Sequence, residues 1–456
     1  MLFTQYAFFV FFATVVVLNF ALHRFGTAQK TLLIAASLAF FLSWGGANVA
    51  LFAVMLAGNY PVARAIHRSS GRPRDLLLAG AIALDIAVLL HFKYSTFFLV
   101  EVLGLQLPAA AAWAPLGLSF YTFHLISYHV DIHQRTCAPG RFIDYAGYIS
   151  FFPHLIAGPI VRCRQLMPQF EERLAAPRFN WAGGTLAFSI GFFLKCSADL
   201  IATAIDPDWT YAGAPGLSSG DAWAVAFLFS CQIFGDFAGY SYMAIGLARF
   251  LGYELPVNFN APYLAASFRE FWQRWHITLS RFLRDYLYIL ALGGNRAGNF
   301  RTQLNTMITM LLGGLWHGAN WNFVLWGGIH GAVLVVERWL GFDTPAGKAL
   351  IARAAWYGVV QAVVIVAWVF FRAPDLATAS VILAKMFLVT DRNSIDTAHL
   401  NALALAVPVI GYHLARLAGE RIRLDHPVGA GALSAALLFA SLILMNRPAK
   451  FIYFEF

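Results

Sequence analysis

Long apolar runs separated by short polar loops dominate the pattern of this chain. A helix needs about 20 predominantly apolar residues to cross a bilayer, and many of the runs reach or approach that length. The pattern therefore predicts an all-α, polytopic membrane protein of roughly 11–12 transmembrane helices. The candidate spans are Leu2–Leu22, Thr31–Trp44, Val49–Ile66, Leu76–Phe98, Leu116–Val130, Leu186–Ala204, Asp221–Phe250, Gln303–Trp316, Trp321–Leu340, Ile351–Phe371, Ala402–Leu417 and Gly431–Met445.

Basic residues concentrate in three short loops, which sets the expected orientation of the spans. Cytoplasmic loops are enriched in Lys and Arg, so Arg64–Arg74, Arg162–Arg178 and Arg269–Arg301 are expected inside. Counting spans from these loops places the N-terminus outside and the C-terminus outside, with the acidic loop around Asp206 also outside. No small-residue cleavage site follows the first run, so it is interpreted as a retained helix rather than a signal peptide.

Two apolar stretches would invert this orientation if they crossed the membrane. Ala146–Ile160, which contains "FFPHLIAGPI", and Thr378–Val389 are therefore expected to be re-entrant or interfacial. Irregular backbone persists at membrane depth only where protein or a water-filled cavity surrounds it. The expected fold is one membrane-embedded domain over residues 1–456 with its helices around a central tunnel, because no soluble domain, repeat or low-complexity tract stands out.

The composition agrees with a membrane protein and argues against a nucleic-acid-binding protein. Of the 456 residues, 59% are hydrophobic and 12% are charged, against about a quarter charged in soluble domains. The formal net charge of +9 comes from the basic loops, so no nucleic-acid partner is expected. Without CxxC spacing, neither a disulfide framework nor a metal site is inferred for the four cysteines, which are Cys137, Cys163, Cys196 and Cys231.

The segment Phe268–Arg296 is too charged to span the membrane and predicts an amphipathic helix at the inner interface. Its apolar face contains Phe271, Trp272, Trp275, Leu279, Phe282 and Leu283. Its arginines either anchor it to anionic lipid heads or also recognise a polyanionic cytoplasmic substrate such as coenzyme A, whose phosphates suit guanidinium groups. They are Arg269, Arg274, Arg281, Arg284 and Arg296. His276 fits the second interpretation, although an ordinary buried histidine would explain it as well.

Two histidines interrupt the apolar run "LLGGLWHGANWNFVLWGGIHG", Leu311–Gly331. His317 and His330 are thirteen positions apart, which on one helix is about 20 Å of rise and excludes joint action on one atom. Gly318 and Asn320 suit a turn between two spans. An ionisable residue at membrane depth is costly and is by default a functional candidate.

His317 is the stronger candidate of the pair, because it lies where a hairpin of two predicted spans turns within the membrane. A neutral imidazole can take a proton from a hydroxyl near pH 7. His330, in the middle of the next helix, is interpreted as a packing residue.

A third group of histidines raises the question of a metal. His124, His129 and His133, with Asp131, have a spacing that could bind zinc, but one aromatic-rich span that reaches the inner interface explains them more simply. No metal is expected, and the absence of a P-loop and of GxGxxG leaves nucleotide chemistry without support.

Five stretches together resemble the membrane-bound O-acyltransferases, in particular the bacterial branch that acetylates exported polysaccharides such as alginate. They lie in residues 116–331 and read "LGLSFYTFHLISYHVDIH", "FFPHLIAGPIVR", "GDFAGYSYMAIGLARFLGYELPVNFNAPY", "EFWQRWHITLSRFLRDYLYILALGGNR" and "LLGGLWHGANWNFVLWGGIHG". The resemblance implies that His317 matches the near-invariant active-site histidine and His276 a second conserved polar position. Tyr242 departs from the Asp of many alginate-type relatives, which affects the expected substrate but not the reaction class.

The C-terminal tail, residues 446–456, ends in "FIYFEF" with Tyr453. It is similar to the tail of bacterial systems of this family, in which the tyrosine is proposed to carry the acyl group. An aromatic belt that anchors the last helix is the alternative.

The resemblance implies an acetyl transfer across the bacterial inner membrane. Acetyl-CoA would bind near the Arg269–Arg296 segment, His317 would act as general base, and Tyr453 or the serine of a periplasmic serine-hydrolase-like partner would receive the acetyl group for an exported polysaccharide. Two alternatives stay open. One is a D-alanyl or lipid acyltransferase of the same fold, and the other is a transporter with the histidines as a proton relay.

Overall fold

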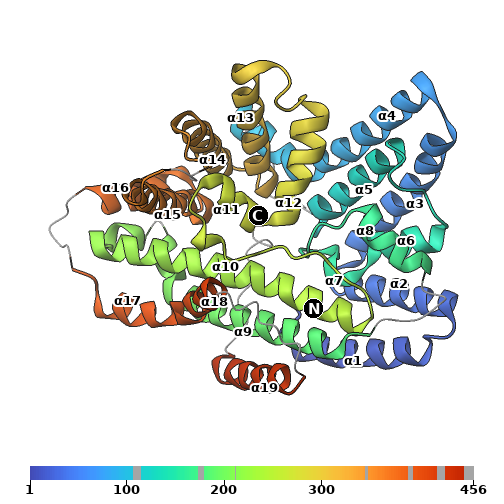
Figure 1. Ribbon diagram of the computed structural model, residues 1–456, viewed down its shortest axis with the longest axis horizontal. Helices are drawn as coiled ribbons and strands as arrows, with labels where there is room; N and C mark the ends of the chain where they lie inside the picture. The colour runs from blue at the N-terminus through green and yellow to red at the C-terminus, as the bar shows by residue number, and fades with distance from the viewer. Residues whose placement is uncertain are drawn as a thin grey trace. The chain divides into compact units, whose positions relative to one another are not determined.

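The computed structural model describes residues 1–105, 115–172, 179–210, 212–344, 348–388, 394–418 and 427–445. Within these ranges every regular element is helical (Figure 1), which confirms the predicted all-α class. The α-helices are α1 (Tyr6–Ala21), α2 (Gly26–Leu42), α3 (Gly46–Arg68), α4 (Gly71–Leu89), α5 (Leu118–His133), α6 (Phe142–Ser150), α7 (Phe152–Leu155), α8 (Cys163–Glu171), α9 (Trp181–Ile205), α10 (Ser219–Phe250), α11 (Phe268–Arg274), α12 (Ile277–Phe282), α13 (Gly298–His317), α14 (Trp321–Leu340), α15 (Leu350–Arg372), α16 (Leu376–Phe387), α17 (Thr397–Ala402), α18 (Val407–Leu417) and α19 (Pro427–Leu444).

Shorter or wider helical turns complete the element list. They are η1 (Leu90–Tyr94), η2 (Phe97–Val102), η5 (Asp206–Trp209), η6 (Ala214–Gly216), η7 (Pro262–Leu264), η8 (Leu283–Ala291) and η9 (Leu403–Ala406).

Seven helical stretches among the described residues are long and apolar enough to cross a membrane, and four shorter apolar helices accompany them. The chain is therefore a multi-pass membrane protein. The seven are Gly46–Arg68, Gly71–Tyr94, Trp181–Trp209, Ser219–Phe250, Trp321–Leu340, Leu350–Arg372 and Thr397–Leu417. The predicted spans Leu116–Val130 and Gln303–Trp316 form α5 and α13 but are not among these apolar helices.

The stretch Ala146–Ile160 does not form one continuous helix. α6 ends at Ser150, α7 contains only four residues, and every residue from Asp144 to Cys163 is buried. The hydroxyl of Tyr148 donates to the carbonyl oxygen of Val161 at 2.9 Å, so protein groups satisfy part of this irregular backbone, as a low-dielectric surrounding requires. The other stretch that was expected not to cross the membrane, Thr378–Val389, lies largely in α16. The 12 residues of this helix span only about 18 Å.

The chain divides into two compact units: unit 1 contains Met1–Phe188 and Ser241–Pro256, and unit 2 contains Ser189–Tyr240 and Val257–Phe456. In unit 1, α2 packs against α6, and α3 packs against both α4 and α5. The Lys30 ammonium lies 2.5 Å from the Asp144 carboxylate, with both side chains 1% exposed. Because a buried charge requires a partner, this ion pair joins α2 to α6.

The connection between α5 and α6 corrects the expectation for the cysteines. A disulfide joins Cys137 in this connection to Cys163 at the start of α8, with the Cα atoms 6.2 Å apart. The two residues are 26 positions apart, so no spacing motif marks them, and they meet only because the connection folds back onto α8. Cys196 and Cys231 are free and buried.

In unit 2, α13 and α14 form a tightly packed hairpin (Figure 1). A Cβ atom on Gly314 would lie 2.2 Å from the carbonyl oxygen of Phe323, and one on Gly327 would lie 2.3 Å from that of Met310. Small residues permit such close approach between helices in a membrane. The hairpin therefore depends on glycine at both positions.

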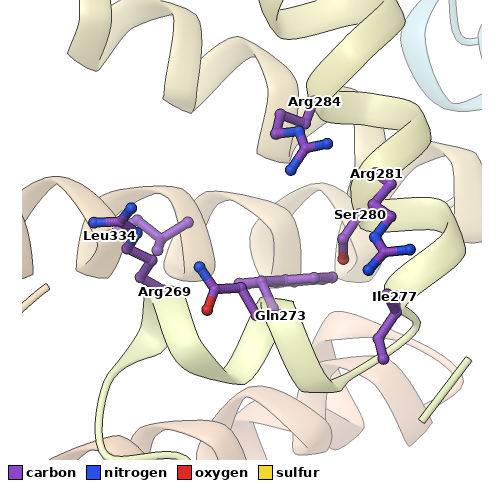
Figure 2. Close-up of a pocket in the computed structure, with 8 residues that line it drawn as sticks. Arg269, Gln273, Ile277, Ser280, Arg281, Arg284 and Leu334 are labelled. Carbon is purple, nitrogen blue, oxygen red and sulfur yellow. The ribbon is translucent and has the colours of Figure 1, made fainter. Parts of the chain in front are cut away.

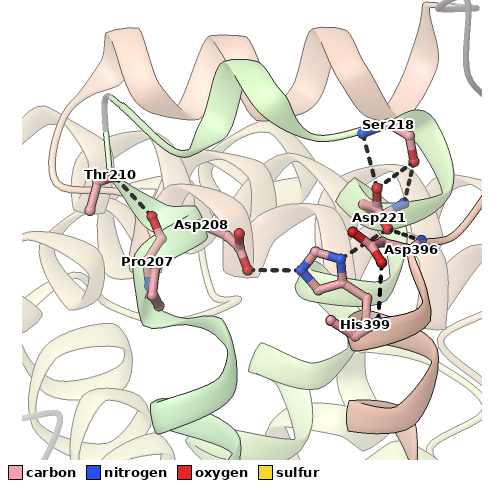
Figure 3. A network of polar contacts seen from close by, with 8 residues as sticks. Pro207, Asp208, Thr210, Ser218, Asp221, Asp396 and His399 are labelled. Atoms are coloured by element: carbon pink, nitrogen blue, oxygen red, sulfur yellow. Dashed lines mark hydrogen bonds and ion pairs between the residues drawn. The ribbon is translucent and has the colours of Figure 1, made fainter.

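A network of polar side chains surrounds His399 in unit 2 (Figure 3). The two ring nitrogens of His399 lie 2.9 Å from an Asp221 oxygen and 3.0 Å from an Asp208 oxygen. A carboxylate only accepts hydrogen bonds, so the geometry favours a doubly protonated imidazolium. The network connects η5, the start of α10 and α17. Asp208 belongs to the acidic loop noted above.

Candidate active site

The turn between α13 and α14 positions His317. This histidine is the last residue of α13, and Gly318 follows it in extended conformation. The Asn320 side chain then accepts a hydrogen bond from the backbone N–H of Asn322, the second residue of α14. The side-chain amide of Asn322 donates to the carbonyl oxygen of Ala373 at 2.7 Å. The Gly-Ala-Asn sequence thus ends one helix and caps the next, as predicted for Gly318 and Asn320.

Three aromatic side chains surround His317. Its ring centroid lies 5.0 Å from that of Trp316, 5.0 Å from that of Trp326 and 5.2 Å from that of Phe371. The residue is only 3% exposed. We refer to these three rings as the aromatic cage.

His276 is also close to Trp316. Its ring centroid is 6.2 Å from that of Trp316, so one indole ring contacts both candidate histidines. The residue adopts a left-handed backbone conformation, with φ of 39°, between α11 and α12. The predicted single amphipathic helix over Phe268–Arg296 is therefore wrong: it breaks at His276, because an L-residue in this conformation cannot continue a right-handed helix.

Hydrogen bonding defines the protonation of His276. The Asn258 side-chain oxygen accepts from the Nδ1 of His276 at 3.1 Å and from the backbone N–H and hydroxyl of Thr278. This arrangement puts the proton on Nδ1. The Nε2 atom is buried and has no hydrogen-bond partner among the described residues. Burial lowers the pKa of His276 to about 3, so the ring is neutral at pH 7.

His330 is fully buried among aromatic rings, as a packing residue would be. It stacks on Phe271 with centroids 5.9 Å apart and contacts Trp272 at 5.3 Å and Trp326 at 4.8 Å. Neither ring nitrogen has a hydrogen-bond partner in the described part of the chain. These polar atoms therefore make weak contacts with the surrounding aromatic rings. Trp326 contacts both His317 and His330, which places an indole between the two histidines.

A basic pocket of about 540 Å³ is lined by residues of α11, α12, η8 and α14 (Figure 2). Of the five predicted arginines, Arg269, Arg281 and Arg284 line it, from α11, α12 and η8 respectively. Sequence reasoning did not select Gln273 and Ser280, which also line it. The guanidinium groups suit the phosphates of a polyanionic ligand.

The two remaining predicted arginines have other surroundings. Arg274 donates to the Glu270 carboxylate at 2.8 Å and to the carbonyl oxygen of Asn260 at 3.2 Å, so its side chain stabilises the local fold. Arg296 is exposed and does not line the pocket. A second pocket of about 580 Å³ shares Arg269 and adds Arg353 from α15. No motif marks Arg353, because only folding brings α15 to this position.

The basic pocket lies close to His276 in the chain and close to His317 in space. Ile277, which directly follows His276, lines the basic pocket, and so does Trp272. The Trp272 ring contacts the Trp326 ring at 5.7 Å, and Trp326 belongs to the aromatic cage. The wall of the pocket is thus one layer of aromatic rings away from His317.

The histidines of α5 do not converge on one point. His124 accepts from the backbone N–H of Val161, His129 contacts Asn59, and His133 contacts Asp75. In the part of the chain that the structure describes, no group of three potential metal ligands occurs. Tyr453 lies outside the described residues.

The fold and site define a class of protein: an all-helical, multi-pass membrane protein with buried histidines beside a basic pocket. A model of the membrane-bound O-acyltransferase family matches residues 111–371, more than half of the chain. The chain therefore belongs to this family, as the sequence motifs predict, and it is an acyltransferase. This membership decides against the transporter alternative.

Several bacterial enzymes are similar to this chain over about half of its length or more. The probable alginate O-acetylase AlgI of Azotobacter vinelandii is 38% identical over 86% of this chain and 80% of its own length. The peptidoglycan O-acetyltransferase of Helicobacter pylori is 36% identical over 82% of this chain and 76% of its own length. The teichoic acid D-alanyltransferase of Streptococcus thermophilus is 27% identical over 49% of this chain and 57% of its own length.

Proposed function

We propose that this chain is an O-acetyltransferase of the bacterial inner membrane, which transfers acetyl groups from cytoplasmic acetyl-CoA toward an exported polysaccharide. The observation that carries the proposal is the position of His317, one layer of aromatic rings from the basic pocket. The names of the relatives supply the acceptor class, since they describe acetylation of alginate and of peptidoglycan.

The basic pocket is the proposed site of the donor. Arg269, Arg281 and Arg284 would bind phosphates of acetyl-CoA, and a thioester directed past Ile277 would approach the histidines. Arg284 also pairs with Asp285 at 2.6 Å, so part of its charge is already compensated. Arg281, which lines the pocket from α12, is the residue chosen for a test of the pocket.

His317 is the proposed general base. A neutral imidazole takes the proton of the acceptor hydroxyl while the oxygen attacks the thioester carbon. The new C–O bond forms, the C–S bond breaks, and the proton passes to the departing thiolate. His276 would face the same reaction space through its Nε2 atom, which is bare and buried.

The first acceptor is proposed to be Tyr453 or the serine of a periplasmic serine-hydrolase-like partner. A covalent acyl-tyrosine would divide one difficult transfer into two simpler ones. This role requires a periplasmic C-terminus, in agreement with the orientation predicted from the basic loops.

The decisive experiment uses the purified full chain in lipid vesicles, with acetyl-CoA labelled in the acetyl group. His317→Ala should reduce thioester consumption by about 10²–10⁴-fold, the usual contribution of a general base, at unchanged membrane level and helical content. His330→Ala serves as the matched control, because His330 contacts the same Trp326 ring from α14.

Three outcomes would count against parts of the proposal. Unchanged turnover in His317→Ala would remove the general base. Full activity of Tyr453→Phe, together with no acetylated C-terminal peptide in mass spectrometry, would remove the tail from the mechanism. Turnover of a carrier-protein thioester in place of acetyl-CoA would favour the D-alanyl alternative.

A further inference from the structure

Another basic pocket lies in unit 1, beside the C-terminal end of α3. It has a volume of about 450 Å³. The last turns of the apolar helix α3, which ends at Arg68, form one side of the pocket, and the connection that leads into α6 forms the other. The residues that matter here are Tyr60, Arg64, His67, Arg68, Arg141 and Phe142.

The pocket carries a surplus of positive charge. Arg141 donates to Asp144 at 2.8 Å, but the same carboxylate already pairs with buried Lys30. Within the described residues, no carboxylate forms an ion pair with Arg64 or Arg68. Glu171 approaches the wall at Gly140, and burial raises the pKa of its carboxyl group. The cations therefore outnumber the carboxylates, which favours an anionic ligand.

The wall opposite α3 is held in place before any ligand binds. The Tyr60 hydroxyl donates to the carbonyl oxygen of Gly140 at 3.0 Å, and the Tyr128 hydroxyl donates to that of Pro139 at 2.9 Å. The disulfide at Cys137 attaches the same connection to α8. A pocket with preformed walls binds its ligand without ordering a loop.

Aromatic rings beside the arginines distinguish an amphiphile from a small soluble anion. The Tyr60 and Phe142 rings meet edge to face with centroids 5.3 Å apart, and Phe142 is 48% exposed. Aromatic rings at a membrane boundary lie at the level of the lipid headgroups. They add nothing to the binding of a free phosphate ion, whereas the glycerol and upper acyl chain of a lipid can pack against them.

We propose that this pocket binds the phosphate headgroup of an anionic phospholipid. Arg64 and Arg68 donate to the phosphate oxygens, and Tyr60 and Phe142 contact the glycerol region. Guanidinium groups match phosphate oxygens in bidentate geometry, and basic pockets between transmembrane helices are known sites for anionic lipids. Bound lipid would connect the end of α3 to the segment that leads into α6, apart from the residues of the candidate acyl-transfer site.

Native mass spectrometry of the full chain in detergent tests this proposal, with phosphatidylglycerol, phosphatidylcholine and inorganic phosphate as probes. Phosphatidylglycerol should bind in preference to the other two. The double variant Arg64→Gln/Arg68→Gln should bind it roughly 30-fold more weakly, because each arginine at an anionic lipid surface contributes about a factor of five. Arg64→Lys/Arg68→Lys should retain more binding than the glutamine pair.

The matched control is Arg24→Gln/Arg72→Gln, which removes two exposed arginines of unit 1 outside the pocket. It should bind phosphatidylglycerol as the unmodified chain does. Equal loss in the control would show diffuse attraction and overturn the proposal. So would unchanged binding in Arg64→Gln/Arg68→Gln, or displacement of the lipid by an equal concentration of inorganic phosphate.

Discussion

Single side chains at the candidate site derive their properties from their neighbours. His276 is neutral because it is buried, and its proton lies on Nδ1 because Asn258 accepts there. Trp-His and Trp-His-Gly marked His276 and His317 in the sequence, whereas Asn258 was not selected, although it lies within one of the quoted family stretches, in "VNFN". Its role depends on a contact across 18 positions, which no local pattern contains.

Arg281 offers a prediction at the residue scale. Arg281→Gln should raise the KM for acetyl-CoA about tenfold with little change in kcat, because a hydrogen bond to a charged group contributes about 1.5–3 kcal/mol and the phosphates are remote from the reacting carbon. Initial rates at varied acetyl-CoA measure the effect. Arg296→Gln is the control, since Arg296 lies outside the pocket. An equal rise in KM for both variants would indicate general attraction rather than binding in the pocket.

The helices that form the candidate site depend on close packing, which the periodicity of apolar residues does not predict. The hydrophobic runs predicted α13 and α14 as neighbours joined by a short turn, and this was correct. The amphipathic segment was expected to be one helix, but left-handed His276 divides it. The start of α11 is held by the Glu337 carboxylate, which accepts from the backbone N–H groups of Phe268 and Arg269.

The α13–α14 hairpin permits a paired test of this packing. Gly314→Ala should destabilise the protein by about 1–3 kcal/mol, as overpacking typically does, because its Cβ would lie 2.2 Å from a backbone oxygen. The displaced hairpin should also lose acetyl transfer. Gly328→Ala should be nearly neutral, since its Cβ would meet only the Leu311 side chain at 3.5 Å. Thermal unfolding in detergent compares the two, and equal stability of both variants would contradict the packing argument.

At the scale of the whole molecule, membrane insertion follows from composition, but the polar interior does not. Lys195 of α9 lies 2.7 Å from Asp236 of α10 and also pairs with Asp199, and all three are buried. Burying charges requires such mutual compensation. In the sequence, the lysine and its acids stand in runs that predict only apolar spans.

The predicted orientation of the chain can be measured by labelling. In a background with the four cysteines replaced by serine, Arg72→Cys should react with an impermeant maleimide only from the cytoplasmic side. Ala212→Cys, which follows the acidic loop and is exposed, should react only from the opposite side, because Lys- and Arg-rich loops stay inside. Right-side-out and inverted vesicles distinguish the two sides. Labelling of both positions from one side would refute the orientation.

The sequence by itself determined the helical class, the membrane environment and the family, because these depend on hydropathy and on local motifs such as Trp-His-Gly. It also singled out His276 and His317 as candidates, because histidine is unusual in apolar runs. Only the tertiary structure decided that one indole, Trp316, contacts both histidines, that three of five arginines share one pocket, and that Cys137 meets Cys163. These contacts join residues that are distant in sequence, and their energies depend on packing that exists only after the helices associate.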